Sequence, residues 1–144
     1  MTDSTTPIEA LEAAGYRITG PRRSVSELTS GRTGTFSAAE LEADARRRRL
    51  RVGRATIFRA LELFVELGVV ERLDLPSGEH AYIRCEPAHH HHLICSRCGR
   101  AEEVADAGLQ EVTESIARRT GFRIDAHRLE LFGLCPTCVG ATDA

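Results

Sequence analysis

Hydrophobic residues recur at helical spacing as far as Leu67 and then alternate with polar residues, so the first half of the chain is predicted to be helical and to end in strands. Helices are predicted over residues 8–14, from the Thr19-Gly20-Pro21 segment to Leu28, and from a cap at Ser37 to about residue 47. Glu40 follows Ser37 at the spacing of a capping box. Residues 30–35 are predicted to form a loop.

The segment from Thr56 to Leu67 is the most periodic in the sequence, because Ile57, Leu61 and Phe64 form one apolar stripe. Residues 69–75 and 80–84 alternate on either side of a Pro-Ser-Gly turn, which predicts a β-hairpin. Short helices followed by a hairpin are the order of a winged helix-turn-helix domain. In that domain the last helix enters the major groove of DNA and the hairpin is the wing.

A second, smaller module follows Pro87. Residues 90–94 and 102–104 are predicted to be extended, residues 109–120 to form an amphipathic helix, and residues 123–132 to form a strand. The predicted fold class is α+β, with a winged-helix DNA-binding domain over residues 1–84, a hinge at 85–88 and a small α/β domain over residues 89–144. Because so small a module buries little apolar surface, we expect metal, a second subunit or both to stabilise it.

Composition narrows the class of protein. Hydrophobic residues make up 42% of the chain, which is enough for a core, and no apolar run is long enough to span a membrane. The segment up to Pro7 lacks the basic and apolar pattern of a signal peptide, so we expect a cytoplasmic protein. In that compartment, closely spaced cysteines indicate metal ligands or redox thiols rather than structural disulfides.

The charges are unevenly distributed, although the net charge of −2 does not itself indicate a nucleic-acid partner. All 19 basic residues are arginines, and residues 46–59 contain seven of them and no acidic residue. Such a run can be no more than a solvated face, but beside a predicted recognition helix it favours contact with DNA phosphates. The predicted phosphate contacts are Arg46, Arg47, Arg48, Arg49, Arg51 and Arg54, with Arg17, Arg22 and Arg23 beside the second helix as further candidates.

Three residues of the predicted recognition helix, Thr56, Phe58 and Arg59, are expected to face the DNA. Arg59 is the candidate for reading a base edge, because a guanidinium can donate two hydrogen bonds to guanine. Phe58 can offer apolar contact to a thymine methyl group.

Two cysteine pairs give the strongest chemical signal. Cys95 and Cys98 are separated by two residues, and so are Cys135 and Cys138. Each pair can present two thiolates to one tetrahedral zinc ion, so the four cysteines predict a closed structural zinc site. Two redox pairs or buried free thiols are the alternatives.

The histidine run from His89 to His92 gives the second signal. Side chains alternate along a strand, so His89 and His91 would lie on one face and His90 and His92 on the other. One run can therefore serve two metal sites, with Cys85 close by in the sequence. A solvated histidine patch is the alternative; an affinity-tag remnant does not fit a run that is internal and close to Cys95.

Four segments together resemble the ferric uptake regulator family of bacterial metal-sensing repressors: Gly15 to Thr19 with Pro21 and Arg22, Ala55 to Leu61, His89 to Cys98, and Cys135 to Cys138. The resemblance covers nearly the whole chain. It implies an N-terminal winged-helix domain, a C-terminal α/β dimerisation domain, and a homodimer that binds double-stranded operator DNA.

Within this family the chain resembles the zinc uptake regulator branch. The loop at Thr35 to Ser37 lacks the histidine of iron-type sensors, and the strand from Tyr82 to Cys85 lacks their glutamate. The resemblance implies a sensory zinc site in addition to the structural one, hence two zinc ions per subunit. It also implies a further metal site, which would make three if it binds. The implied sensory ligands are Glu71, Cys85, His90 and His92; the further set is His89, His91, His127 and position 110, where Gln110 is a poor ligand with Glu111 beside it.

Two alternatives remain open at this point. The same fold could sense nickel, iron, manganese or peroxide, although the thiolate of Cys85 favours zinc over iron(II) or manganese. A zinc hydrolase or thiol oxidoreductase is the alternative from another class. Catalytic zinc needs an open coordination position, whereas a four-cysteine site is closed. We therefore expect no enzyme, no organic substrate and no membrane partner.

Overall fold

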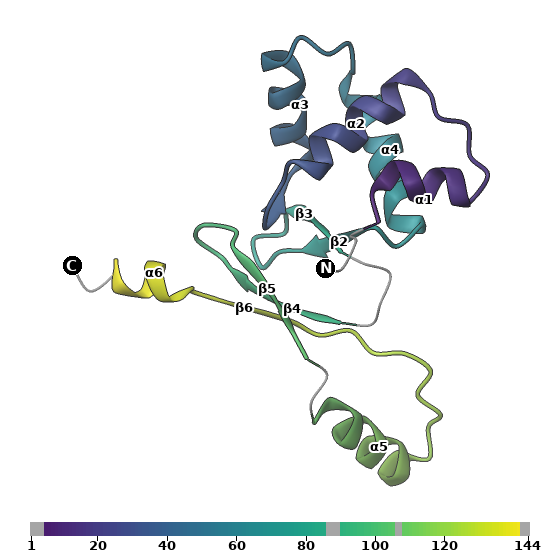
Figure 1. Ribbon diagram of the computed structural model, residues 1–144. Helices are drawn as coiled ribbons and strands as arrows, with labels where there is room; N and C mark the ends of the chain where they lie inside the picture. The colour runs from purple at the N-terminus through teal and green to yellow at the C-terminus, as the bar shows by residue number, and fades with distance from the viewer. Residues whose placement is uncertain (1–4, 86–89, 106–107, 142–144) are drawn as a thin grey trace. The chain divides into compact units, whose positions relative to one another are not determined.

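A computed structural model describes residues 5–85, 90–105 and 108–141, and the chain forms two compact units, residues 1–88 and 89–144 (Figure 1). Residues 86–88 of the predicted hinge lie outside the described residues, as does His89. Within the described ranges, no helix has the length and apolar character needed to cross a bilayer.

The first unit contains four helices: α1 (Pro7–Ala13), α2 (Gly20–Ser30), α3 (Ala38–Arg47) and α4 (Arg54–Glu66). All four predicted helices are confirmed, with α4 starting two residues earlier than Thr56. The predicted capping box is present at α3: the Ser37 hydroxyl accepts from the backbone N–H of Glu40 at 3.1 Å, and the Glu40 carboxylate accepts from the N–H of Ser37 at 2.6 Å.

An antiparallel sheet of order β1-β3-β2 completes this unit, from β1 (Thr35–Phe36), β2 (Val70–Asp74) and β3 (His80–Arg84). The predicted hairpin is confirmed as β2 and β3. The prediction that residues 30–35 form a loop is wrong at its end, because Thr35 and Phe36 pair with β3. Phe36 is buried and its ring centroid lies 6.1 Å from that of Tyr82, and this packing holds the short strand in place.

Helix α4 has one buried apolar face and one exposed face, as the sequence predicts. Ile57, Leu61 and Phe64 are fully buried in a core shared with α1, α2 and α3, and each contributes roughly 1.5–3 kcal/mol by burial. Arg54, Phe58 and Arg59 are exposed on the opposite side. The core therefore fixes α4 and leaves its polar face available for a partner.

The second unit is built on a sheet of order β5-β4-β6, from β4 (His91–Cys95), β5 (Ala101–Val104) and β6 (Glu130–Gly133). Strand β4 is antiparallel to β5 and parallel to β6, with α5 (Leu109–Thr120) in the crossover (Figure 1). The predicted strand over residues 123–132 is mostly wrong: pairing begins at Glu130, opposite His92, because β4 itself begins only one residue earlier. The short helix α6 (Pro136–Gly140) was not predicted.

This unit leaves much apolar surface uncovered. Helix α5 buries none of its residues, although Val112 and Ile116 lie on its apolar side. Val112 is 53% exposed, Phe122 is 74% exposed, and Leu93 and Leu131 of the sheet are also exposed. The rest of the unit therefore does not cover the apolar side of α5.

Arg49 is the one described non-glycine residue with a positive φ, at 55°. It follows α3 and helps to close it: the Arg49 N–H donates to the carbonyl of Arg46 at 3.1 Å, and the Leu50 N–H donates to that of Ala45 at 2.9 Å. This is the Schellman arrangement, whose left-handed position usually holds glycine.

Arg49→Gly is therefore expected to raise the free energy of unfolding by about 1 kcal/mol, because glycine adopts this conformation without steric cost. Urea denaturation of the purified protein measures the change. Arg49→Ala is the control, because it removes the same charge but keeps the strained backbone, and it should give no such gain. Equal gains in both variants would show that charge repulsion, rather than backbone strain, is relieved.

Candidate metal centre and nucleic-acid interface

The sulfur atoms of Cys95, Cys98, Cys135 and Cys138 all lie within 4.8 Å of one another. The sulfurs of Cys98 and Cys135 are 3.7 Å apart. Zinc–sulfur bonds of about 2.3 Å give a tetrahedron whose edges are about 3.8 Å. The four side chains therefore fit a closed tetrahedral zinc site.

Sheet topology brings the two cysteine pairs together. Because β4 and β6 are parallel and Cys95 is in register with Gly133, the segments that follow both strands lie at the same end of the sheet. Gly99, with φ 76°, closes the first turn by donating its N–H to the carbonyl of Cys95. Arg97 links the two turns by donating to the carbonyl of Cys138 at 3.0 Å.

Hydrogen bonds within this cluster shift the pKa values of two of its thiols in opposite directions. Backbone N–H groups of Cys135 and Cys98 lower the pKa of Cys95 to about 6. A side-chain hydrogen bond with Cys135 is the main cause that raises the pKa of Cys138 to about 12. Without metal, the cluster thus favours one thiolate and keeps another thiol protonated, so zinc binding would displace protons from it.

The histidines of β4 are divided between two neighbourhoods. The rings of His90 and His92 meet edge to face with centroids 4.6 Å apart. The rings of His91 and His127 stack with centroids 5.0 Å apart, and their Nε2 atoms are 3.2 Å apart. The structure thus places His90 with His92 and separates His91 from them, which is the pairing that strand alternation predicts.

Glu71 and Cys85 lie together in the first unit. Glu71 on β2 is opposite Ile83, and the N–H of Cys85 donates to the carbonyl of Val69 at 3.2 Å, which continues the same ladder. Glu71 and Cys85 are therefore diagonal neighbours on one face of the sheet. The predicted sensory ligands thus consist of one pair from each unit.

The further metal set is less complete. Gln110 and Glu111 are exposed at the start of α5, and the Gln110 amide donates to Glu114 at 3.1 Å. Within the described ranges, no acidic residue, cysteine or histidine completes a three-ligand set with His91 and His127.

The exposed face of α4 carries the residues predicted to meet DNA. The guanidinium carbon of Arg54 lies 5.9 Å from the centroid of the Phe58 ring. Arg59 lies beside Thr56, with Nη2 at 3.5 Å from the hydroxyl oxygen. The helix thus presents two cations, an aromatic ring and a hydroxyl group on one side.

Two arginines of the run at residues 46–59 lie close to acidic residues from outside the run. Arg47 forms an ion pair with Asp44, and Arg54 lies 3.9 Å from the carboxylate of Glu42. Both acidic residues belong to α3 and precede residue 46, so counting charges within the run missed them. The spacing of Asp44 and Arg47 was the available signal, because residues three apart are neighbours on a helix.

At the start of α2, the two flanking arginines contact each other. Arg22 donates to the carbonyl of Arg17 at 2.7 Å, and its guanidinium carbon lies 5.8 Å from the centroid of the Tyr16 ring. These contacts leave the side chain of Arg17 exposed beside the helix terminus.

Comparison with known proteins gives a consistent result. The model of the ferric uptake regulator family matches residues 13–132. The zinc uptake regulation protein of Mycobacterium tuberculosis (strain H37Rv) is 37% identical over 128 residues, covering 89% of this chain and 98% of that protein.

Solved structures agree. That of the Vibrio cholerae ferric uptake regulator has a TM-score of 0.69 at 30% identity, covering 88% of this chain and 98% of that one. A zinc uptake regulator complexed with zinc and DNA has a TM-score of 0.70 at 27% identity, covering 97% of this chain and 99% of that one.

The α+β fold, with a winged helix followed by a small metal-binding unit, defines a metal-responsive transcription regulator rather than an enzyme. The chain belongs to the ferric uptake regulator family. The resemblance that its cysteine and histidine motifs indicated is therefore confirmed.

Proposed function

We propose that this protein is a zinc-responsive transcriptional repressor of the cytoplasm, which binds palindromic operator DNA as a zinc-loaded homodimer. The observation that carries the proposal is the composition of its two metal-ligand sets. One set contains only thiols. The other, as the resemblance implies it, adds the thiol of Cys85 to two imidazoles and one carboxylate. Thiolate and imidazole ligands together suit zinc better than iron(II) or manganese. The 37% identity to a zinc uptake regulation protein supports this choice of metal.

Two zinc ions per subunit have separate roles in this proposal. Cys95, Cys98, Cys135 and Cys138 would hold the structural ion, because their geometry is closed. The sensory ion would be held by Glu71 and Cys85 from the first unit and by His90 and His92 from the second. Ligands from both units would fix the two recognition helices of a dimer at a single spacing, which half-sites one helical turn apart require.

The homodimer is supported by the uncovered apolar surface of the second unit. Val112, Ile116 and Phe122 are exposed on and just after α5, and Leu131 is exposed on β6. A second copy of the same unit would bury these side chains. A symmetric dimer would also match the two-fold symmetry of a palindromic site.

Contact with DNA is assigned to the exposed face of α4 and to the basic residues around it. Arg59, with Thr56 and Phe58, would face base edges in the major groove. Exposed arginines outside α4, among them Arg46, Arg49 and Arg51, would mainly contact phosphates. A solved zinc uptake regulator in complex with zinc and DNA, similar in fold along 97% of this chain, supports the assignment.

A third metal site is the less supported part of the proposal. His91 and His127 would supply two imidazoles, and His89 with Glu111 could complete the set only after rearrangement, because Gln110 is engaged with Glu114. We therefore expect this site to bind zinc weakly and to affect DNA binding less than the sensory site does.

The test is DNA binding in metal-buffered solutions. Purified protein should be incubated with a duplex library, and bound sequences recovered in buffers of free zinc, iron(II), nickel or manganese. Zinc in the micromolar range or below should enrich a palindrome, and the other ions at equal free concentration should not. Enrichment by iron(II) or manganese but not zinc would favour the second candidate, a family member that senses another metal.

A further inference from the structure

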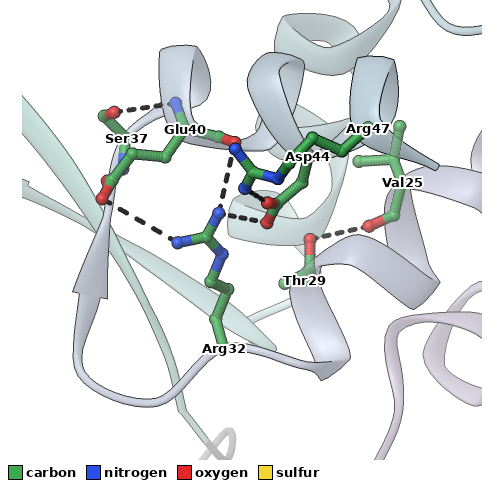
Figure 2. Close-up of polar contacts among 7 residues, drawn as sticks. All are labelled: Val25, Thr29, Arg32, Ser37, Glu40, Asp44 and Arg47. Carbon is green, nitrogen blue, oxygen red and sulfur yellow. Dashed lines mark hydrogen bonds and ion pairs between the residues drawn. The ribbon is translucent and has the colours of Figure 1, made fainter.

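Asp44 on α3 contacts two arginines from different segments, Arg32 and Arg47 (Figure 2). Arg32 belongs to the loop after α2, and Arg47 lies one turn further along α3. The side chain of Asp44 is only 17% exposed, whereas that of Arg47 is 68% exposed. One mostly buried carboxylate thus serves two guanidinium groups.

The contact with Arg32 has a structural role. Arg32 also donates to the backbone carbonyl of Glu40 at 3.2 Å and lies 3.8 Å from the Glu40 carboxylate (Figure 2). Its side chain is 22% exposed. Three contacts with α3 tie the loop to that helix, so Arg32 is held within the fold.

The contact with Arg47 differs, because Arg47 stands in the middle of the arginine run. The side chains of its neighbours Arg46, Arg49 and Arg51 are exposed and make no hydrogen bond or ion pair within the described part of the chain. Exposed ion pairs are weak, so exchanging the carboxylate of Asp44 for a DNA phosphate would cost Arg47 little free energy. The buried neighbour Asp44, however, also repels a phosphate that approaches the same place.

We propose that Asp44 is an internal counter-ion that keeps Arg47 from contacting DNA phosphates and thereby limits the affinity for DNA of any sequence. The inference rests on the proposed DNA-binding function. Its consequence is that Arg46, Arg49 and Arg51 contact phosphates while Arg47 does not. A lower sequence-independent affinity makes binding depend more on base reading by α4 and on the metal.

The test measures the salt dependence of binding to a fluorescein-labelled duplex of random sequence, between about 50 and 200 mM salt. Log affinity falls as log salt rises, and each phosphate contact makes the slope about 0.9 more negative. Asp44→Asn should steepen the slope by about 0.9 and raise affinity at the lower salt concentration by about 3- to 10-fold. Arg47→Gln in the otherwise unchanged protein should leave the slope as it is.

The double variant assigns the effect to Arg47. Asp44→Asn combined with Arg47→Gln should return the slope to that of Arg47→Gln alone. Arg32→Gln is the matched control, because it breaks the tie between loop and helix but leaves the pair of Asp44 and Arg47. It should bind with the original slope.

Several outcomes would overturn the inference. A shallower slope for Arg47→Gln with Asp44 in place would show that Arg47 already contacts phosphates. This variant changes an exposed side chain and tests the idea even if Asp44→Asn does not fold. A steeper slope in Arg32→Gln would assign the effect to the loop. If the zinc-loaded original protein bound no DNA at any salt concentration, the proposed function itself would fail.

Discussion

Replacing Cys85 with alanine is expected to abolish the zinc dependence of DNA binding. Glu71 and Cys85 are neighbours on one sheet, and His90 and His92 are neighbours in the other unit. To move a two-state equilibrium from almost entirely inactive to almost entirely active, a ligand must bind the active state about 10⁴-fold more tightly. Without the thiolate, the first unit offers only the carboxylate of Glu71, and that preference for the active state is lost.

Fluorescence anisotropy with operator DNA across a series of free zinc concentrations measures this change. His90→Ala should have the same effect, because it removes a ligand from the second unit. His127→Ala is the matched control: it also removes an imidazole, but one that faces His91 rather than His90 and His92. Its effect should be smaller. Both sensory variants should still carry about one tightly bound zinc ion per chain at the four-cysteine site, and they should remain dimeric.

A fully zinc-dependent Cys85→Ala protein would contradict the assignment. The sensory role would then move to His91 and His127, together with His89.

Replacing Cys98 with serine is expected to remove the structural zinc and to unfold the second unit. The second unit has a small sheet and a helix, α5, that buries none of its residues. Its apolar core is therefore too small to stabilise it without the metal. Zinc binding in small zinc domains is worth about 10–16 kcal/mol, and this free energy belongs to folding, so losing one of four ligands should cost several kcal/mol.

Zinc content after mild chelation and molecular mass by light scattering measure the outcome for Cys98→Ser. The expected result is a zinc-depleted protein without a stable dimer. Cys85→Ser is the control, since it removes a thiol outside the cluster and should keep the structural ion. A stable, dimeric and zinc-free Cys98→Ser protein would show that the cluster is not structural.

Local patterns were sufficient to predict most elements of the first unit. The stripe of Ile57, Leu61 and Phe64 predicted α4, and the spacing of Ser37 and Glu40 predicted the start of α3. Both predictions were possible because the residues that form each signal lie only a few positions apart. Strand β1 could not be found in this way. It has two residues and depends on packing between Phe36 and Tyr82, which are far apart in the sequence.

For the metal cluster and the charged contacts, too, local signals could be read from the sequence, whereas contacts between distant segments could not. Cysteine spacing predicted each half of the four-sulfur cluster, because two residues between cysteines suit one metal ion. The parallel register of β4 and β6 that brings the halves together depends on a crossover of more than thirty residues, for which the sequence offers no local signal. The contact of Asp44 with Arg32 was missed for a related reason: it joins a loop to a helix, and neither residue belongs to a recognisable motif. The contact of Asp44 with Arg47, by contrast, had a local signal in the spacing of the two residues.

Because β4 pairs with β6, the last strand of the chain, the two units can finish folding only at different times during synthesis. All elements of the first unit are made before Cys135 is reached, and its helices depend on contacts between segments close in sequence. Such units fold early and quickly as the chain emerges. The second unit has no β6 and only half of its sulfur ligands at that stage. The first unit is thus complete while Cys95 and Cys98 still lack the two cysteines with which they are proposed to bind zinc. We expect their thiols to be most open to oxidation during this interval.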